Sequence, residues 1–167
     1  GADALRLSLV MGTTPGQDSR LFEEKIESYR NFVTKLWNIY RYSASSSENF
    51  KLIKDISENE IKTLADRWVI NELNKTILFV SSSLEKKEIS LAQERLRVFT
   101  WDQFADWYLE IHKIEKNDVV LGYIIDKILK LWHPFVPFVT EKIFQDFYEG
   151  KKMLMVENWP TADKKTK

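Results

Sequence analysis

Apolar side chains recur at intervals of three and four residues along most of this sequence, the spacing of amphipathic α-helices. The spacing is clearest over residues 70–84, 98–111 and 121–131. No segment alternates between apolar and polar residues for long enough to predict a sheet. The pattern therefore predicts an all-α, up-and-down bundle of four long helices plus smaller pieces.

The first two helices are marked by their terminal residues. A short helix at the start is expected to close at Gly12, because glycine readily adopts the left-handed conformation that ends helices. Asp18 or Ser19 is expected to cap the first long helix, which runs to about Ser43. A Ser-rich stretch then predicts a surface loop.

Two capping-box patterns follow along the chain. Ser57 with Glu60, and Ser90 with Gln93, have the spacing at which each side chain can bond the other residue's backbone N–H. They predict the starts of the second and third long helices.

The last helices are bounded by Asn, Pro and Gly. Asn117 or Asp118 can start a fourth long helix, which Pro134 stops. Pro137 suits the first turn of a final helix that Gly150 can terminate. The remaining tail has no helical period, and its last residues are expected to be frayed.

Composition narrows the class of protein. The 167 residues suffice for one well-buried domain, and 25 basic and 25 acidic side chains give a net charge of zero. A nucleic-acid partner would therefore be held by a local surface and not by overall charge. The absence of Cys fits a reducing compartment, and no apolar run is long enough to span a membrane. We expect a cytoplasmic domain with no membrane partner.

Candidate catalytic chemistry is sparse. His112 and His133 are the only histidines, and neither has a partner at the helical spacing of a metal site. The chain has no phosphate-binding glycine loop and no nucleophile elbow. Its own residues therefore predict neither a catalytic site nor a metal site.

Aromatic residues are abundant, with 6 Trp, 6 Tyr and 10 Phe. Aromatic side chains at helical spacing normally fill a bundle's interior. We therefore expect Trp68, Trp101, Trp107 and Trp132 to lie in the core.

The segment YRNFVTKLWNIYRY in the first long helix carries a second pattern. At about 100° per residue, one side of this helix is apolar and forms the expected buried face. Its members are Ile26, Tyr29, Phe32, Val33, Leu36, Trp37 and Tyr40.

The opposite side of the same helix is polar, yet it includes one aromatic residue. Asn31, Lys35, Asn38 and Tyr42 fall nearly opposite the apolar face, with Arg30, Thr34 and Arg41 beside them. Amides, cations and an outward ring suit single-stranded RNA, because rings stack on bases and cations meet phosphates. The alternative is that Tyr42 covers the Ser-rich loop.

Several segments together resemble a known family. GADALRLSLVMGTTPGQD, YRNFVTKLWN, LADRWVINELN, FTWDQFADWYLE, LWHPFVPFVTEKIF and VENWP occur in the order and rough spacing of the C-terminal third of valyl-tRNA synthetases. The resemblance covers nearly the whole chain and implies the α-helical anticodon-binding domain of these class I enzymes. Thr34 stands where the family usually has Asn, and Ala105 where Cys is common.

The resemblance also implies a domain layout. Residues 1–18 would end the segment that links the catalytic domain to the bundle, and residues 19–150 would form the anticodon-binding domain. Residues 151–167 would lead toward a coiled coil outside this sequence.

The implied function is recognition of valine tRNA. The parent would join valine to tRNA with ATP and Mg, in a catalytic domain that this sequence lacks, and this piece would need no cofactor. The catalytic domain of the same chain would be a second partner. The residues expected to bind the anticodon stem and loop are Arg30, Asn31, Lys35, Asn38, Arg41 and Tyr42.

Two alternatives stay open. The outward face of the bundle could contact protein instead, with Tyr42 as an interface anchor. The segment HPFVPFVTE also resembles segments of isoleucyl- and leucyl-tRNA synthetases. The second alternative is therefore that the chain is the equivalent domain of one of those enzymes.

Overall fold

The computed structural model describes residues 1–12 and 21–162, and in these ranges it contains helices and no strand. The all-α prediction is confirmed. The elements are α1 (Ala2–Val10), α2 (Glu23–Ala44), η1 (Glu58–Glu60), α3 (Leu64–Glu85), α4 (Ile89–Val98), η2 (Phe99–Tyr108), α5 (Leu109–Glu115), α6 (Asp118–Trp132), α7 (Pro137–Phe147) and η3 (Leu154–Val156).

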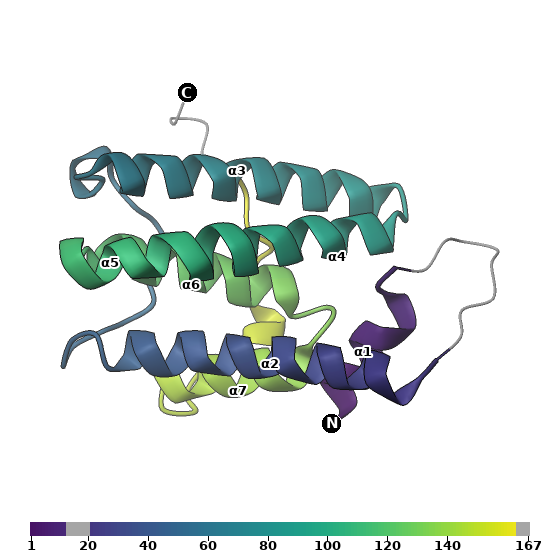
Figure 1. The fold of residues 1–167 in the computed structure, drawn as a ribbon. Coiled ribbons are helices and arrows are strands. Elements are labelled where there is room, and N and C mark those ends of the chain that lie inside the picture. The colour runs from purple at the N-terminus through teal and green to yellow at the C-terminus, as the bar shows by residue number, and fades with distance from the viewer. Residues whose placement is uncertain (13–20, 163–167) are drawn as a thin grey trace.

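The long helices run roughly parallel or antiparallel to one another (Figure 1). α4, η2 and α5 join end to end into one long helix that lies beside α3, and the ten-residue η2 in its middle is π-helical. α2 and α7 lie together on the other side of the bundle, with the short α1 against α2.

α6 is the central helix, because thirteen of its fifteen residues are buried. Trp132 at its end is fully buried and lies 4.6 Å, between ring centroids, from Phe32 of α2. The segment after α2 crosses α6 so closely at Gly122 that a Cβ there would lie 2.3 Å from the Lys51 carbonyl oxygen. α6 is thus enclosed by elements from both halves of the chain.

The capping boxes do not begin the helices that were predicted from them. Ser57 and Glu60 do form a capping box, but it caps the three-residue η1. α3 begins later, where Thr63 and Asp66 make a second box. The Ser90 prediction is wrong: Ser90 lies inside α4, and its hydroxyl accepts a hydrogen bond of 3.0 Å from the Gly12 backbone N–H.

Most of the other predicted boundaries agree with the structure. Asn117 caps α6, α6 ends before Pro134, and Pro137 opens α7. Gly12 and Gly150, which follow α1 and α7, both have φ of +72°. Asp18 and Ser19 lie outside the described residues, and the prediction that one of them caps the first long helix is wrong, because the N-cap residue of α2 is Phe22.

The two ends of the described chain are tied to the bundle. The Asp3 carboxylate in α1 accepts hydrogen bonds from two backbone N–H groups at the start of α7. Beyond α7, Glu157 accepts a hydrogen bond from Lys54, and the Trp159 indole donates to Ser81 of α3. The segment after α7 therefore packs on the bundle as far as it is described.

The tryptophan prediction is half right. Trp132 is buried and donates to Thr100 Oγ1 at 2.9 Å, and Trp101 is partly buried against Phe32. Trp68 and Trp107 are exposed on the long helices. Helical spacing alone could not show that the space beneath those two positions is already filled.

Candidate nucleic-acid interface

The surface of α2 that faces away from the bundle is polar. Its exposed residues include Arg30, Asn31, Thr34, Asn38 and Arg41. Their exposure follows from the helical period, because the residues buried on α2 lie on its opposite side. Four of the six predicted RNA-binding residues therefore share one accessible face.

The cations on this face are available to a ligand. Arg30 lies 2.8 Å from Glu27, but both side chains are more than half exposed, so the pair contributes little stability and can open. Arg41, in the last turn of α2, has no ion-pair partner among the described residues. Its position beside the helix C-terminus suits a positive charge.

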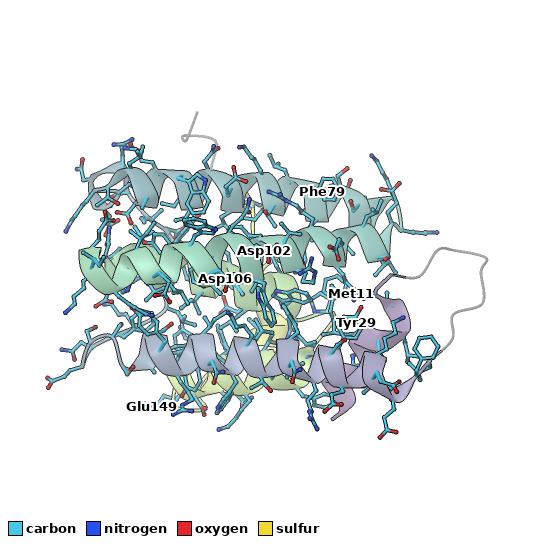
Figure 2. The ribbon with its side chains drawn as sticks, viewed as in Figure 1. Met11, Tyr29, Phe79, Asp102, Asp106 and Glu149 are labelled. Carbon is cyan, nitrogen blue, oxygen red and sulfur yellow. The ribbon has the colours of Figure 1, made fainter. Side chains whose placement is uncertain are left out.

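Lys35 is not on the open face. Its ammonium Nζ lies 2.9 Å from Asp106 Oδ1 and 4.8 Å from the centre of the Trp101 ring. Asp106, which Figure 2 labels, and Trp101 belong to η2, so Lys35 links α2 to that long helix. The outward placement predicted for Lys35 is wrong.

The outward placement predicted for Tyr42 is also wrong. Its ring is partly buried against the core, and its hydroxyl lies 2.9 Å from His112 Nδ1. Burial raises the pKa of the Tyr42 phenol, so it remains a neutral donor. The contact is with α5, and the apolar pattern of α2 did not predict it.

The error came from the angle assigned to the buried face. The buried residues of α2 include Ile39 and Ser43, which the apolar pattern omitted. The four residues of α2 that are buried therefore place the centre of the face about 70° closer to Tyr42 than the apolar pattern does. Tyr42 then lies about 90° from that centre, at the border between core and solvent.

His112 is the inner partner of Tyr42. It is 2% exposed, and its Nε2 lies 3.2 Å from Asp118 Oδ1 without the alignment of a full hydrogen bond. Burial lowers the pKa of His112, and Asp118 opposes this only in part. A neutral ring that accepts a hydrogen bond from the Tyr42 hydroxyl at Nδ1 carries its own proton on Nε2, which faces Asp118.

An open depression of about 560 Å³ lies at the C-terminal end of α2. It is lined by Asn38, Tyr40, Arg41, Tyr42, Ala44 and Ser45. The lining thus includes one amide, one guanidinium and two aromatic residues. These groups can read a base edge, hold a phosphate and stack on an unpaired base.

Sequence reasoning missed three residues of this depression, which are Tyr40, Ala44 and Ser45. The apolar pattern of α2 predicts Tyr40 in the core. With the buried face centred on Ile39 and Ser43, Tyr40 lies on one border and Tyr42 on the other, with Arg41 between them. Buried Ser43 is the signal that could have revealed this, because it shows where the core continues at the helix end.

Among the described residues, no three His, Asp or Glu side chains gather as a metal site would require. His133 lies near Thr140 and Glu141, and burial lowers its pKa. Within the same ranges, no helix is both long and apolar enough to cross a bilayer.

Sequence comparison identifies the class of protein. The family described as the anticodon-binding domain of tRNA ligase matches residues 66–167. The chain belongs to this family.

Similar full-length proteins carry a more particular name. The chain is 41% identical to the valine–tRNA ligase of Staphylococcus epidermidis, over 98% of this chain and 20% of that protein. It is 40% identical to the valine–tRNA ligase of Staphylococcus aureus strain MRSA252, over 96% of this chain and 19% of the relative. The chain thus spans about a fifth of the length of these relatives.

The fold has a solved counterpart. A chain in the ternary complex of Agrobacterium radiobacter K84 agnB2 LeuRS with tRNA and LeuAMS superimposes with a TM-score of 0.85. The match covers 99% of this chain and 20% of that one, at 19% sequence identity. At that identity the likeness concerns the fold alone.

Proposed function

We propose that this chain is the anticodon-binding part of a valine–tRNA ligase and holds the anticodon stem and loop of valine tRNA on α2. The observation that carries the proposal is the depression at the end of α2, where Tyr40 and Tyr42 flank Arg41 and Asn38. The family match and the identity to valine–tRNA ligases support it.

Each group has a role that its chemistry permits. Arg30 and Arg41 contact phosphates and set the position of the RNA, while Asn31 and Asn38 read base edges. Tyr42 stacks on an unpaired base with its ring, since its hydroxyl is engaged by His112. Lys35 holds α2 against η2 through Asp106, and adds positive potential near the site.

The chemistry of the parent enzyme lies outside these residues. We propose that the parent activates valine with ATP and Mg and transfers it to tRNA in the cytoplasm, and that its catalytic domain is a second partner of this bundle. The support is the name of the relatives, of which this chain spans about a fifth. The chain's own contribution is binding and selection of the tRNA.

The test is a titration of the chain with valine tRNA and with a tRNA of altered anticodon, at several salt concentrations. Arg41→Met should weaken the binding of both tRNAs similarly. It should also make the slope of log affinity against log salt concentration shallower by about 1, because one phosphate contact is lost. Lys35→Met should change the slope less, since its ammonium is already paired with Asp106.

Asn38→Ala should weaken the binding of valine tRNA more than the binding of the tRNA with the altered anticodon, because base contacts carry the sequence information. Arg67→Met is the matched control, since Arg67 is an exposed ion-paired arginine on α3. Equal affinity for both tRNAs in every variant would contradict anticodon reading, and an effect of Arg67 equal to that of Arg41 would contradict the α2 site.

A further inference from the structure

A second hollow, of about 780 Å³, lies between α3 and the long helix formed by η2 and α5. Its apolar lining is strongly exposed: Leu64 is 83% exposed, Trp107 is 67% exposed and Trp68 is 36% exposed. Ala65 and Ile111 complete the apolar part. Contiguous exposed apolar surface of this kind commonly marks a contact site.

The bundle does not need these side chains for its own core. On the inner side of η2, Phe104 and Tyr108 are at most 1% exposed, and on α3 Val69 and Leu73 are fully buried. Tyr108 also donates a hydrogen bond of 2.8 Å to buried Asp66. The interior beneath the hollow is therefore filled by other side chains, and Trp107 is not part of the core.

The charged residues that line the hollow are both acidic. Asp102 lies early in η2 and Glu115 ends α5, so a carboxylate stands toward each end of the apolar stripe. Figure 2 shows Asp102 near the middle of the long helix. Neither carboxylate has an ion-pair partner among the described residues. The two residues are thirteen positions apart, which corresponds to about 20 Å along the helix.

We propose that this hollow docks an amphipathic polypeptide helix that carries an apolar stripe and a cationic side chain toward each end. The tryptophans supply large, rigid contact area at the centre, and the two carboxylates set the orientation of the partner at the rim. RNA fits poorly, because its phosphates would meet two carboxylates and no lining cation. A second copy of this chain docked through the same hollow would bring like charges together.

The probes are two synthetic peptides of about four helical turns with the same apolar stripe. One carries Lys at both ends of the stripe and the other carries Glu, and each is titrated into the chain by calorimetry and tryptophan fluorescence. The Lys peptide should bind at least about tenfold more tightly than the Glu peptide, since only it complements the carboxylates.

Variants separate the two parts of the proposal. Trp107→Ser should weaken the Lys peptide at least about tenfold without unfolding the chain, because its side chain is exposed. Leu78→Ser is the matched control, an exposed apolar residue on α3 outside the hollow, and should leave binding unchanged. The double variant Asp102→Asn and Glu115→Gln should abolish the preference for Lys over Glu.

The proposal fails if neither peptide binds, or if both bind equally to the unaltered chain. It also fails if a single-stranded RNA oligonucleotide displaces the Lys peptide, or if sedimentation shows a dimer that Trp107→Ser dissociates. The inference does not depend on the RNA site on α2. Arg41→Met, which tests that site, should bind the Lys peptide normally.

Discussion

The Tyr42 hydroxyl of α2 lies 2.9 Å from Nδ1 of the buried His112 ring of α5. The two rings meet edge to face at 84°, with 5.9 Å between centroids. One border of the candidate RNA site is therefore held by a core residue from another helix. Changes at Tyr42 should alter both stability and binding.

Tyr42→Phe should lower the free energy of unfolding by about 1 to 3 kcal/mol, because buried His112 Nδ1 loses its donor. Tyr29→Phe is the control on the same helix, since the Tyr29 hydroxyl donates to no described residue; its effect should stay within about 0.5 kcal/mol. Chemical denaturation measures both. Identical curves for Tyr42→Phe and the unaltered chain would show that the hydrogen bond is not stabilising.

Because Phe keeps the ring, Tyr42→Phe should retain most of the tRNA affinity, whereas Tyr42→Ala should lose about 1 to 3 kcal/mol of it.

Stability should fall as the pH drops below about 6.5, the ordinary pKa of histidine. Burial lowers the pKa of His112 and of His133 in the folded chain, so the unfolded chain binds more protons in this range. Denaturation at about pH 7.5 and about pH 5.5 tests this, above the range in which carboxylates titrate. His112→Gln should reduce the change, and His133→Gln should reduce it separately. Greater stability at the lower pH would mean that an imidazolium paired with Asp118 is favoured instead.

Asp126→Ala should destabilise the fold by about 3 to 5 kcal/mol. Asp126 is fully buried, with Lys127 Nζ at 3.0 Å and Lys130 Nζ at 2.9 Å from one carboxylate oxygen, so its removal leaves mostly buried ammonium groups without that partner. Glu94→Ala, which breaks an exposed pair with Arg97 in α4, should cost at most about 1 kcal/mol. Similar melting midpoints for the two variants would contradict this ranking.

Trp132→Ala should cost about 3 to 5 kcal/mol, because it removes a fully buried indole from the centre of the bundle. Trp37→Ala should cost clearly less, since Trp37 is only partly buried. Thermal melting of both variants checks the order. A larger loss of stability for Trp37→Ala would mean that the buried face of α2 is centred where its apolar pattern predicts.

The helices could be predicted from the sequence because their signals are local. Asn117, Pro134 and Pro137 act on the backbone within a few residues, and the structure uses them as expected. Ser90 shows the limit of such signals. The same residue type can cap a helix or bond Gly12 from a distant segment, and only the packing of α1 near α4 decides between them.

The candidate site was predicted in part for the same reason. Arg30, Asn31, Asn38 and Arg41 are exposed because the period of α2 alone turns them outward. Lys35 and Tyr42 lie at the border of the buried face, where their environment is set by Asp106 and His112, about 70 residues further along the chain. No local pattern carries that information, so their contacts could not be predicted from the sequence of α2.

The enclosed position of α6 means that the family model and the packed core have different borders. The family match begins at residue 66, yet Phe32 packs on Trp132 and Lys51 passes over Gly122, both from before that point. A polypeptide that began at residue 66 would still match the family model. It would lack the residues before that point that enclose α6, and it would also lack the Thr63 cap of α3. The family model therefore covers less of this chain than the packed core does, whereas the valine–tRNA ligases align over nearly all of it.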